Sequence, residues 1–151
     1  MLTISTSLAR GEGRDVSGPA LVRLCEGAGL EVSHETVPDE RGAIAATLKR
    51  WADREGVRFL FTTGGTGLTI DDVTPEATLD VIEREAPGYA ETIRADSRKH
   101  TPLGILTRGV SGVRGRTLIV NFPGNPKAIE QSWPIVEPTL KHAAQTLERG
   151  A

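Results

Sequence analysis

The sequence is poor in the residues that mark several classes of protein. Cys25 is its only cysteine, so an internal disulfide is excluded, and a lone thiol is typical of a reducing compartment. Aromatic residues make up only 4%, which argues against a surface on which nucleic-acid bases stack. The formal charge is −2, so the chain offers phosphodiester backbones little attraction. We therefore expect no nucleic-acid partner.

Long apolar runs and metal-binding spacings are also missing. No apolar run approaches the roughly 20 residues that span a bilayer, and residues 1–5 do not resemble the start of a secretory signal. His34, His100 and His142 are scattered along the chain and form no Cys/His zinc pattern with Cys25. With 151 residues, of which 38% are hydrophobic, the chain suits one domain over 1–151. We expect a soluble cytoplasmic protein with no membrane partner.

What the sequence does contain is an alternation of strand and helix patterns. Short apolar clusters predict strands at 2–4, 30–37, 57–61, 103–106 and 117–122. Helical spacing predicts helices at 17–29, at 44–52 with a stop at Gly56, at 74–86, at 89–97, and two consecutive helices over 129–147 that break near Pro138. Alternation of this kind predicts an α/β fold with a mostly parallel sheet and helices on both faces. Ligands of such sheets bind beyond the carboxyl ends of the strands.

The first loop of interest, residues 64–67, follows a predicted buried strand. Its sequence is Gly64-Gly65-Thr66-Gly67, and glycines permit positive φ angles that turn backbone N–H groups toward an anion. The spacing is neither that of a P-loop nor that of a dinucleotide-binding fingerprint. A tight turn needs glycine with or without a ligand, so a purely structural role stays open.

Three aspartates lie close to the predicted strand ends. Asp71 and Asp72 precede a helix that starts at Thr74, and Asp39 follows the second predicted strand. Carboxylates beside a phosphate-binding loop are the ligands that Mg²⁺ prefers, together with substrate phosphates. The alternative is that Asp39 and Asp72 cap or compensate the helices that follow them.

A third loop, residues 121–127, ends in a predicted helix start. Asn125 at the N-cap and Pro126 at the first helical position would leave backbone N–H donors free, and Lys127 adds a cation. A plain capped turn is the alternative. Weaker signals complete the ring of loops at Ser5, Ser7 and residues 15–19.

At these residues a family resemblance becomes clear. The motifs that carry it are TTGGTG at 62–67, DVTPEAT at 72–78, TRGVSG at 107–112 and NFPGNPK at 121–127. They resemble the molybdopterin-binding MogA/MoaB family, over about residues 2–147. The resemblance implies a three-layer α/β/α fold, commonly a trimer, and a place in molybdenum cofactor biosynthesis. Family enzymes activate molybdopterin by adenylylation with Mg-ATP and release pyrophosphate.

The resemblance also implies roles for single residues. Asp39 and Asp72 match the two aspartates that the family associates with catalysis, and we expect both to hold Mg²⁺. The residues expected to bind the substrates ATP and molybdopterin are Ser5, Asp15, Ser17, Gly64, Gly65, Thr66, Gly67, Pro123, Gly124, Asn125 and Lys127. A downstream metal-insertion protein would be a further partner.

Two positions depart from the family's pattern. Thr6 stands where the family usually has aspartate, and Asp71 stands where it often has arginine. These departures favour an alternative, a non-catalytic molybdopterin-binding carrier or scaffold of the same family. A third possibility is a nucleotide-binding domain of the competence-damage type, although such domains are usually fused to longer chains. Our prediction is a molybdopterin adenylyltransferase.

Overall fold

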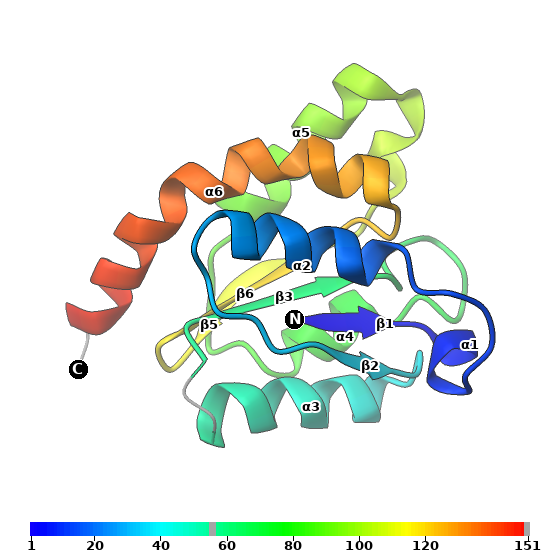
Figure 1. Cartoon of the computed structure of the whole chain (residues 1–151), viewed down its shortest axis with the longest axis horizontal. Helices are drawn as coiled ribbons and strands as arrows, with labels where there is room; N and C mark the ends of the chain where they lie inside the picture. The colour runs from blue at the N-terminus through cyan, green and yellow to red at the C-terminus, as the bar shows by residue number, and fades with distance from the viewer. Residues whose placement is uncertain (55–56, 150–151) are drawn as a thin grey trace.

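The computed structural model describes residues 1–54 and 57–149, in which a six-stranded sheet has the strand order β2-β1-β3-β6-β5-β4 (Figure 1). The strands are β1 (Leu2–Ile4), β2 (Glu35–Val37), β3 (Phe59–Thr63), β4 (Arg84–Glu85), β5 (Ser111–Arg114) and β6 (Thr117–Phe122). The helices are α1 (Thr6–Ala9), α2 (Ser17–Gly27), α3 (Arg41–Arg54), α4 (Thr74–Leu79), α5 (Gly88–His100), α6 (Pro126–Arg149) and the 3₁₀ helix η1 (Pro102–Leu106). Gly56, expected to end α3, lies outside the described residues.

Four adjacent strands run in the same direction. β1 pairs in parallel with β2 and β3, and β3 pairs in parallel with β6. β5 and β4 extend the sheet in antiparallel fashion beyond β6. The predicted α/β fold with a mostly parallel sheet is therefore confirmed, and the carboxyl ends of β1, β2, β3 and β6 meet at one edge.

Helices cover both faces of the sheet, so each face buries its own apolar core (Figure 1). Side chains of successive strand residues point to opposite faces. Phe61 and Val120 accordingly join the core under α2, α5 and α6, whereas Leu60 and Ile119 join the core under α3 and α4. Trp133 of α6 meets Phe61 edge-to-face, with ring centroids 5.9 Å apart. The result is the three-layer arrangement that the resemblance implied.

The predicted strand at 103–106 is wrong. These residues belong to η1, which begins at Pro102 and is capped by the Thr101 hydroxyl accepting from the Leu103 amide. Leu103 is 67% exposed and has no neighbouring strand to cover it. The position beside β6 is instead taken by β5, for which no strand was predicted.

The helix expected over 74–86 is also shorter than its pattern suggests. α4 ends at Leu79, and the chain then returns to the sheet edge as β4. The amides of Glu83 and Ala86 donate to the carbonyls of Val113 and Ser111, which tie this segment to β5. The predicted strand over 30–37 is likewise reduced to the three residues of β2.

The carboxyl-terminal residues form one helix rather than two. α6 runs through both Pro134 and Pro138, and Figure 1 shows it as a continuous ribbon that bends along its length. Its buried residues, among them Trp133, Val136 and Leu140, hold one face against the sheet across both prolines. Packing therefore outweighs the hydrogen bonds that the prolines remove, and the break predicted at Pro138 is wrong. None of the helices in the described part of the chain is both long and apolar enough to cross a bilayer.

Candidate active site

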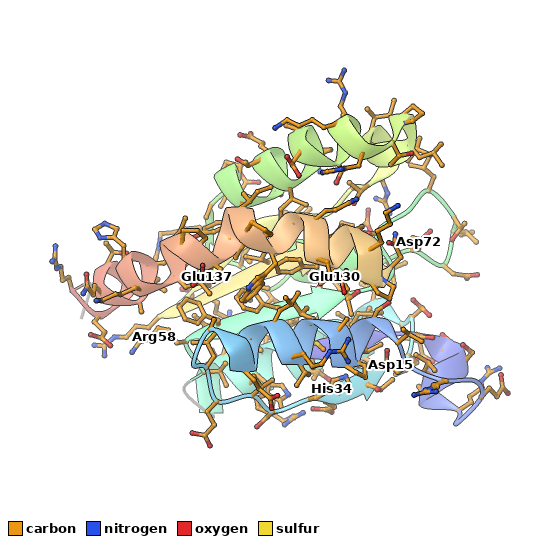
Figure 2. All side chains as sticks on the ribbon, turned by 45° about the horizontal axis from the view of Figure 1, so that its top comes forward. Asp15, His34, Arg58, Asp72, Glu130 and Glu137 are labelled. Atoms are coloured by element: carbon orange, nitrogen blue, oxygen red, sulfur yellow. The ribbon has the colours of Figure 1, made fainter. Side chains whose placement is uncertain are left out.

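The loops singled out in the sequence lie together at the carboxyl edge of the parallel strands. Ser5 follows β1, Asp39 lies two residues beyond β2, Gly64 follows β3, and Pro123 follows β6. Since these four strands are neighbours in the sheet, their loops are neighbours as well. Figure 2 shows Asp15 and Asp72 near this end of the molecule and Arg58 near the other.

The glycine loop has the backbone that its sequence predicted. Gly64 and Gly65 have φ angles of +102° and +66°, which L side chains rarely adopt. A Cβ at Gly64 would lie 2.3 Å from the carbonyl oxygen of Ile4, and one at Gly65 would lie 2.3 Å from Oγ1 of Thr74. The loop is thus packed tightly against β1 and the start of α4, where only glycine fits.

Asp39 is held by the loop that follows β1. Its Oδ2 accepts hydrogen bonds from the Thr6 amide at 2.7 Å and from the Thr6 hydroxyl at 3.0 Å, and the Asp39 amide donates to the same hydroxyl. The other oxygen, Oδ1, faces Gly65, where a Cβ would lie 3.3 Å away. The first helical bond of α3 runs from Ile44 to the carbonyl of Glu40, so Asp39 is not its N-cap. The carboxylate is directed toward the glycine loop.

Asp72 closes the loop between the glycines and α4. Its Oδ2 accepts from the Thr69 amide at 2.9 Å and from the Thr69 hydroxyl at 2.6 Å. The hydroxyl bond from Thr69 is the main cause that lowers the pKa of Asp72 below its ordinary value, so the group is ionised at neutral pH. The N-cap of α4 is Val73, with no side-chain cap, so the capping interpretation of Asp72 is wrong. Thr74, the first residue of α4, donates its hydroxyl to the Gly64 carbonyl.

Arg108 has a role that sequence reasoning did not assign. Its Nε donates to the carbonyl of Gly67 at 2.7 Å, its Nη2 donates to the carbonyl of Asp72 at 2.6 Å, and its guanidinium pairs with the Glu76 carboxylate. Its own amide donates to the carbonyl of Thr66 at 2.8 Å. The TRGVSG motif was the available signal, but the partners of the guanidinium are 32 to 41 residues away and could not be read from it.

The loop after β6 begins α6 as predicted. Asn125 caps the helix, because its Oδ1 accepts from the Ala128 amide at 2.9 Å. Ser17 does not cap α2, whose N-cap is Val16; its hydroxyl donates to the carbonyl of Gly124 at 3.0 Å. Lys127 lies exposed in the first turn of α6.

Asp15 belongs to a hydrogen-bonded cluster that joins α2 to the sheet. Its Oδ2 accepts from the Thr3 hydroxyl at 2.8 Å, and its Oδ1 accepts from the Gly18 amide at 2.9 Å. The single hydroxyl proton of Thr3 is donated to Asp15, so the Thr3 oxygen accepts a hydrogen bond from Nε2 of His34, 2.8 Å away. Burial lowers the pKa of His34, so the ring is neutral at pH 7, with its proton on Nε2. Asp15 therefore has a structural role whether or not a ligand is bound.

Two cavities open at this edge of the sheet. The larger, about 450 Å³, is lined by the glycine loop, the loop after β6, Asp72 and η1. The smaller, about 340 Å³, is lined by Ser5, Asp15, Ser17, Gly64 and Gly124, among others. Gly124 borders both, and a Cβ there would lie 3.5 Å from the Cα of Gly64. Most of the predicted binding residues thus surround two adjacent cavities that share Gly124 in their walls, whereas Asp39 and Lys127 lie outside both linings.

The two aspartates suit a Mg²⁺ ion that also binds phosphate. Oδ1 of Asp39 faces Gly65, and Oδ2 of Asp72 lies where a Cβ at Gly67 would be 2.8 Å away, so both carboxylates border one loop. Within residues 1–54 and 57–149, no three acidic, His or Cys side chains gather to hold a metal. Mg²⁺ is commonly held by one or two carboxylates plus substrate phosphates, and this donor set fits that pattern.

Residues 1–142 match the family described as "Probable molybdopterin binding domain". The chain belongs to this molybdopterin-binding family. The match covers every loop of the site.

Similar proteins include enzymes of known name. The chain is 35% identical over 150 residues to a molybdopterin adenylyltransferase from Helicobacter pylori, covering 97% of this chain and 85% of that protein. It is 46% identical to a molybdopterin biosynthesis enzyme MoaB from Thermus thermophilus, whose crystal structure superposes with a TM-score of 0.89 over 97% of this chain and 92% of the other.

A longer relative contains a region similar to this chain. The chain is 40% identical over 149 residues to the Drosophila melanogaster molybdenum cofactor synthesis protein cinnamon, covering 97% of this chain. It spans only about a quarter of that protein's length, 25%. The comparison therefore extends to one region of cinnamon.

Proposed function

We propose that this protein is a molybdopterin adenylyltransferase acting as a single domain in molybdenum cofactor biosynthesis. The observation that carries the proposal is the pair of adjacent cavities that share Gly124 as a wall, beside a glycine loop bordered by the carboxylates of Asp39 and Asp72. Two neighbouring cavities suit a reaction between two substrates. The bacterial relatives named molybdopterin adenylyltransferase support the same assignment.

The proposed reaction transfers AMP from ATP to molybdopterin. An oxygen of the molybdopterin phosphate attacks the α-phosphorus of ATP, the bond from that phosphorus to the bridging oxygen breaks, and pyrophosphate leaves with the electron pair. No covalent protein nucleophile is needed, so positioning and charge stabilisation account for catalysis. Mg²⁺, when bound, would neutralise negative charge on the phosphates.

The residues of the chain position the phosphates in this scheme. The glycine loop and the amino end of α6 offer backbone N–H donors, and helix amino termini favour negative charge. Asp39 and Asp72 would hold Mg²⁺, and Lys127, exposed in the first turn of α6 outside both cavity linings, would contribute positive charge to phosphate binding. Ser5, Asp15 and Ser17 line the smaller cavity and complete the proposed binding residues.

A carrier function is the second candidate, because of Thr6 and Asp71. Thr6 engages Asp39 through a neutral hydroxyl, at a position where the family usually supplies another carboxylate. Asp71 is exposed close to Asp72 and adds negative charge near the expected phosphates. A protein that binds molybdopterin without transferring AMP would have these features too.

The proposal includes an assembly and a place of action. We propose a homotrimer, as the family resemblance implies, that passes its product to a metal-insertion protein. We also place the reaction in the cytoplasm, where the lone thiol of Cys25 stays reduced.

Incubation of the purified protein with molybdopterin and Mg-ATP tests the proposal, with pyrophosphate release followed over time. Repeated turnover that requires molybdopterin supports the transferase. Saturable molybdopterin binding without pyrophosphate release would support the carrier and contradict the transferase. A control without molybdopterin removes the contribution of simple ATP hydrolysis.

A further inference from the structure

The segment between the glycine loop and α4 packs little against the rest of the molecule. Residues 67–72 carry Leu68 and Ile70, which are 65% and 92% exposed and so contribute little packing. Within the segment, the Asp72 amide donates to the Thr69 carbonyl, and the Asp72 carboxylate accepts from Thr69. These bonds shape the turn, but they do not attach it to the rest of the molecule.

Arg108 provides that attachment at both ends of the segment. Its guanidinium donates to the carbonyl of Gly67 at 2.7 Å and to the carbonyl of Asp72 at 2.6 Å. The same group pairs with Glu76 in the first turn of α4, and its amide donates to Thr66 at 2.8 Å. One residue therefore connects the glycine loop, the turn and α4.

The charge of Arg108 is already matched inside the protein. Glu76 takes the guanidinium on its carboxylate, and the hydrogen bond from Arg108 lowers the pKa of Glu76, which keeps that carboxylate ionised at neutral pH. The remaining donors that are engaged point at backbone carbonyls. An arginine engaged in this way holds protein atoms in place rather than offering a free cation to a phosphate.

We infer that Arg108, held by Glu76, is a positioning residue that sets the place of the Asp72 carboxylate relative to the glycine loop. The inference rests on the proposed function, in which Asp72 holds Mg²⁺ together with substrate phosphates. Only the rigid fork of a guanidinium reaches two carbonyls and a carboxylate at once, whereas a lysine ammonium is a single point of donation. Replacement of a group that hydrogen-bonds to a metal-binding residue and orients it commonly lowers metal affinity by about 10- to 100-fold.

The test compares Arg108→Lys with Arg114→Lys. Arg114 is a matched control, because its guanidinium also joins a carboxylate, Asp53, to a backbone carbonyl, that of Val81. It lies on β5 opposite Thr117 at the start of β6, away from the carboxyl edge. Two measurements are made on each variant: hydrogen–deuterium exchange of the amides of residues 67–72, and the Mg²⁺ concentration that gives half-maximal adenylylation.

For Arg108→Lys we expect faster exchange confined to residues 67–72, with a half-saturating Mg²⁺ concentration raised about 10- to 100-fold. Molybdopterin affinity should stay within about twofold of the wild type, because the turn and not the pterin contact has changed. Arg114→Lys should alter neither measurement. Glu76→Gln, which keeps Arg108 itself, should move both measurements in the same direction by a smaller factor.

Two results would overturn the inference. One is unchanged exchange at 67–72 in both Arg108→Lys and Glu76→Gln. The other is a loss of molybdopterin affinity as large as the shift in Mg²⁺ dependence, which would make Arg108 a substrate contact. If the wild type gives no pyrophosphate, the proposed transferase fails, and Arg108 is then judged by exchange and by calorimetric titration with Mg-ATP.

Discussion

At the scale of single residues, substitution of Asp39 or Asp72 tests metal-assisted chemistry most directly. Neither caps a helix, and asparagine keeps an oxygen that accepts the bonds from Thr6 or Thr69. Asp39→Asn and Asp72→Asn should therefore fold normally and bind molybdopterin, yet lose the charge that holds Mg²⁺. Loss of metal-assisted charge stabilisation costs several kcal/mol, or about a hundredfold or more in rate.

Steady-state pyrophosphate release at limiting and at high Mg²⁺ measures this loss, and excess Mg²⁺ should partly restore a variant that still binds the ion weakly. Asp53→Asn is the control, since it removes one negative charge from the carboxyl-terminal part of α3, where Asp53 pairs with Arg114. Near wild-type turnover of either site variant at limiting Mg²⁺ would show that its aspartate has no role in the reaction.

The ion pair between Arg108 and Glu76 makes a pH-dependent contribution to stability. The pKa of Glu76 lies below its ordinary 4.5 because Arg108 donates to the carboxylate, so the pair stabilises the fold fully above pH 4.5 and less as the pH falls through the lowered value. Glu76→Gln should lower the free energy of unfolding at pH 7 by about 1 kcal/mol or less, as for solvent-accessible ion pairs.

Urea unfolding of wild type and Glu76→Gln at pH 7 and pH 3 checks this expectation. The difference between the two proteins should shrink at pH 3. Glu130→Gln, on the exposed side of α6, is the control (Figure 2). A difference that stays constant or grows at low pH would mean that the carboxylate form of Glu76 does not stabilise the fold.

At the scale of loops and helices, Gly124 offers a cleaner probe of the site than the glycine loop. Replacement of Gly65 by any larger residue forces a shift, because a Cβ there would lie 2.3 Å from Thr74 Oγ1 at a positive φ. Gly124 has no such constraint, and its Cβ would meet the Cα of Gly64 at 3.5 Å, an ordinary contact. Gly124→Val should therefore keep the fold while its side chain narrows the space beside the wall that the two cavities share.

We expect Gly124→Val to weaken molybdopterin or Mg-ATP binding about tenfold or more, which corresponds to about 1.4 kcal/mol. Calorimetric titration measures the affinity, and circular dichroism checks the fold. Gly42→Val, in the first turn of α3 where a Cβ has open space, is the matched control. Wild-type affinity in a folded Gly124→Val would show that neither ligand binds beside Gly124.

The features of loops and helix ends that could be predicted from the sequence depend on neighbouring residues. The Asn125 cap and the positive φ of Gly64 and Gly65 were predictable, because caps and turns depend on residues within about three positions. The loops of the site could be placed because parallel strands bring their carboxyl ends to one edge. The alternation of strands and helices was enough for that step.

The errors have a common physical origin in contacts that are distant along the chain. The continuity of α6 through Pro138 depends on its packing against the sheet, and the η1 conformation of 103–106 depends on β5 occupying the neighbouring strand position. The role of Arg108 requires Gly67, Asp72 and Glu76 to be folded around it. Local periodicity carries no information on such partners.

At the scale of the whole molecule, large apolar side chains remain exposed near the site. They are Leu68, Ile70, Leu103, Ile105 and Leu106, with exposed fractions from 40% to 92%. Leu103 and Leu106 line the larger cavity, and Leu68 and Ile70 lie on the turn between Gly67 and Asp72, which line it too. Several exposed large apolar side chains near one site are a common mark of a protein–protein interface.

We expect the protein to be a trimer in solution, as its family resemblance implies. Size-exclusion chromatography with light scattering should give a mass about three times the 16.1 kDa of one chain. The mass should persist on dilution to micromolar concentration, because a stable assembly buries far more apolar surface than a transient contact. Ile70→Glu is an informative variant, since Ile70 is 92% exposed in the isolated chain and its replacement costs the monomer little. A smaller mass for this variant would place the turn at the interface between subunits, whereas a wild-type mass near one chain at micromolar concentration would end the trimer hypothesis.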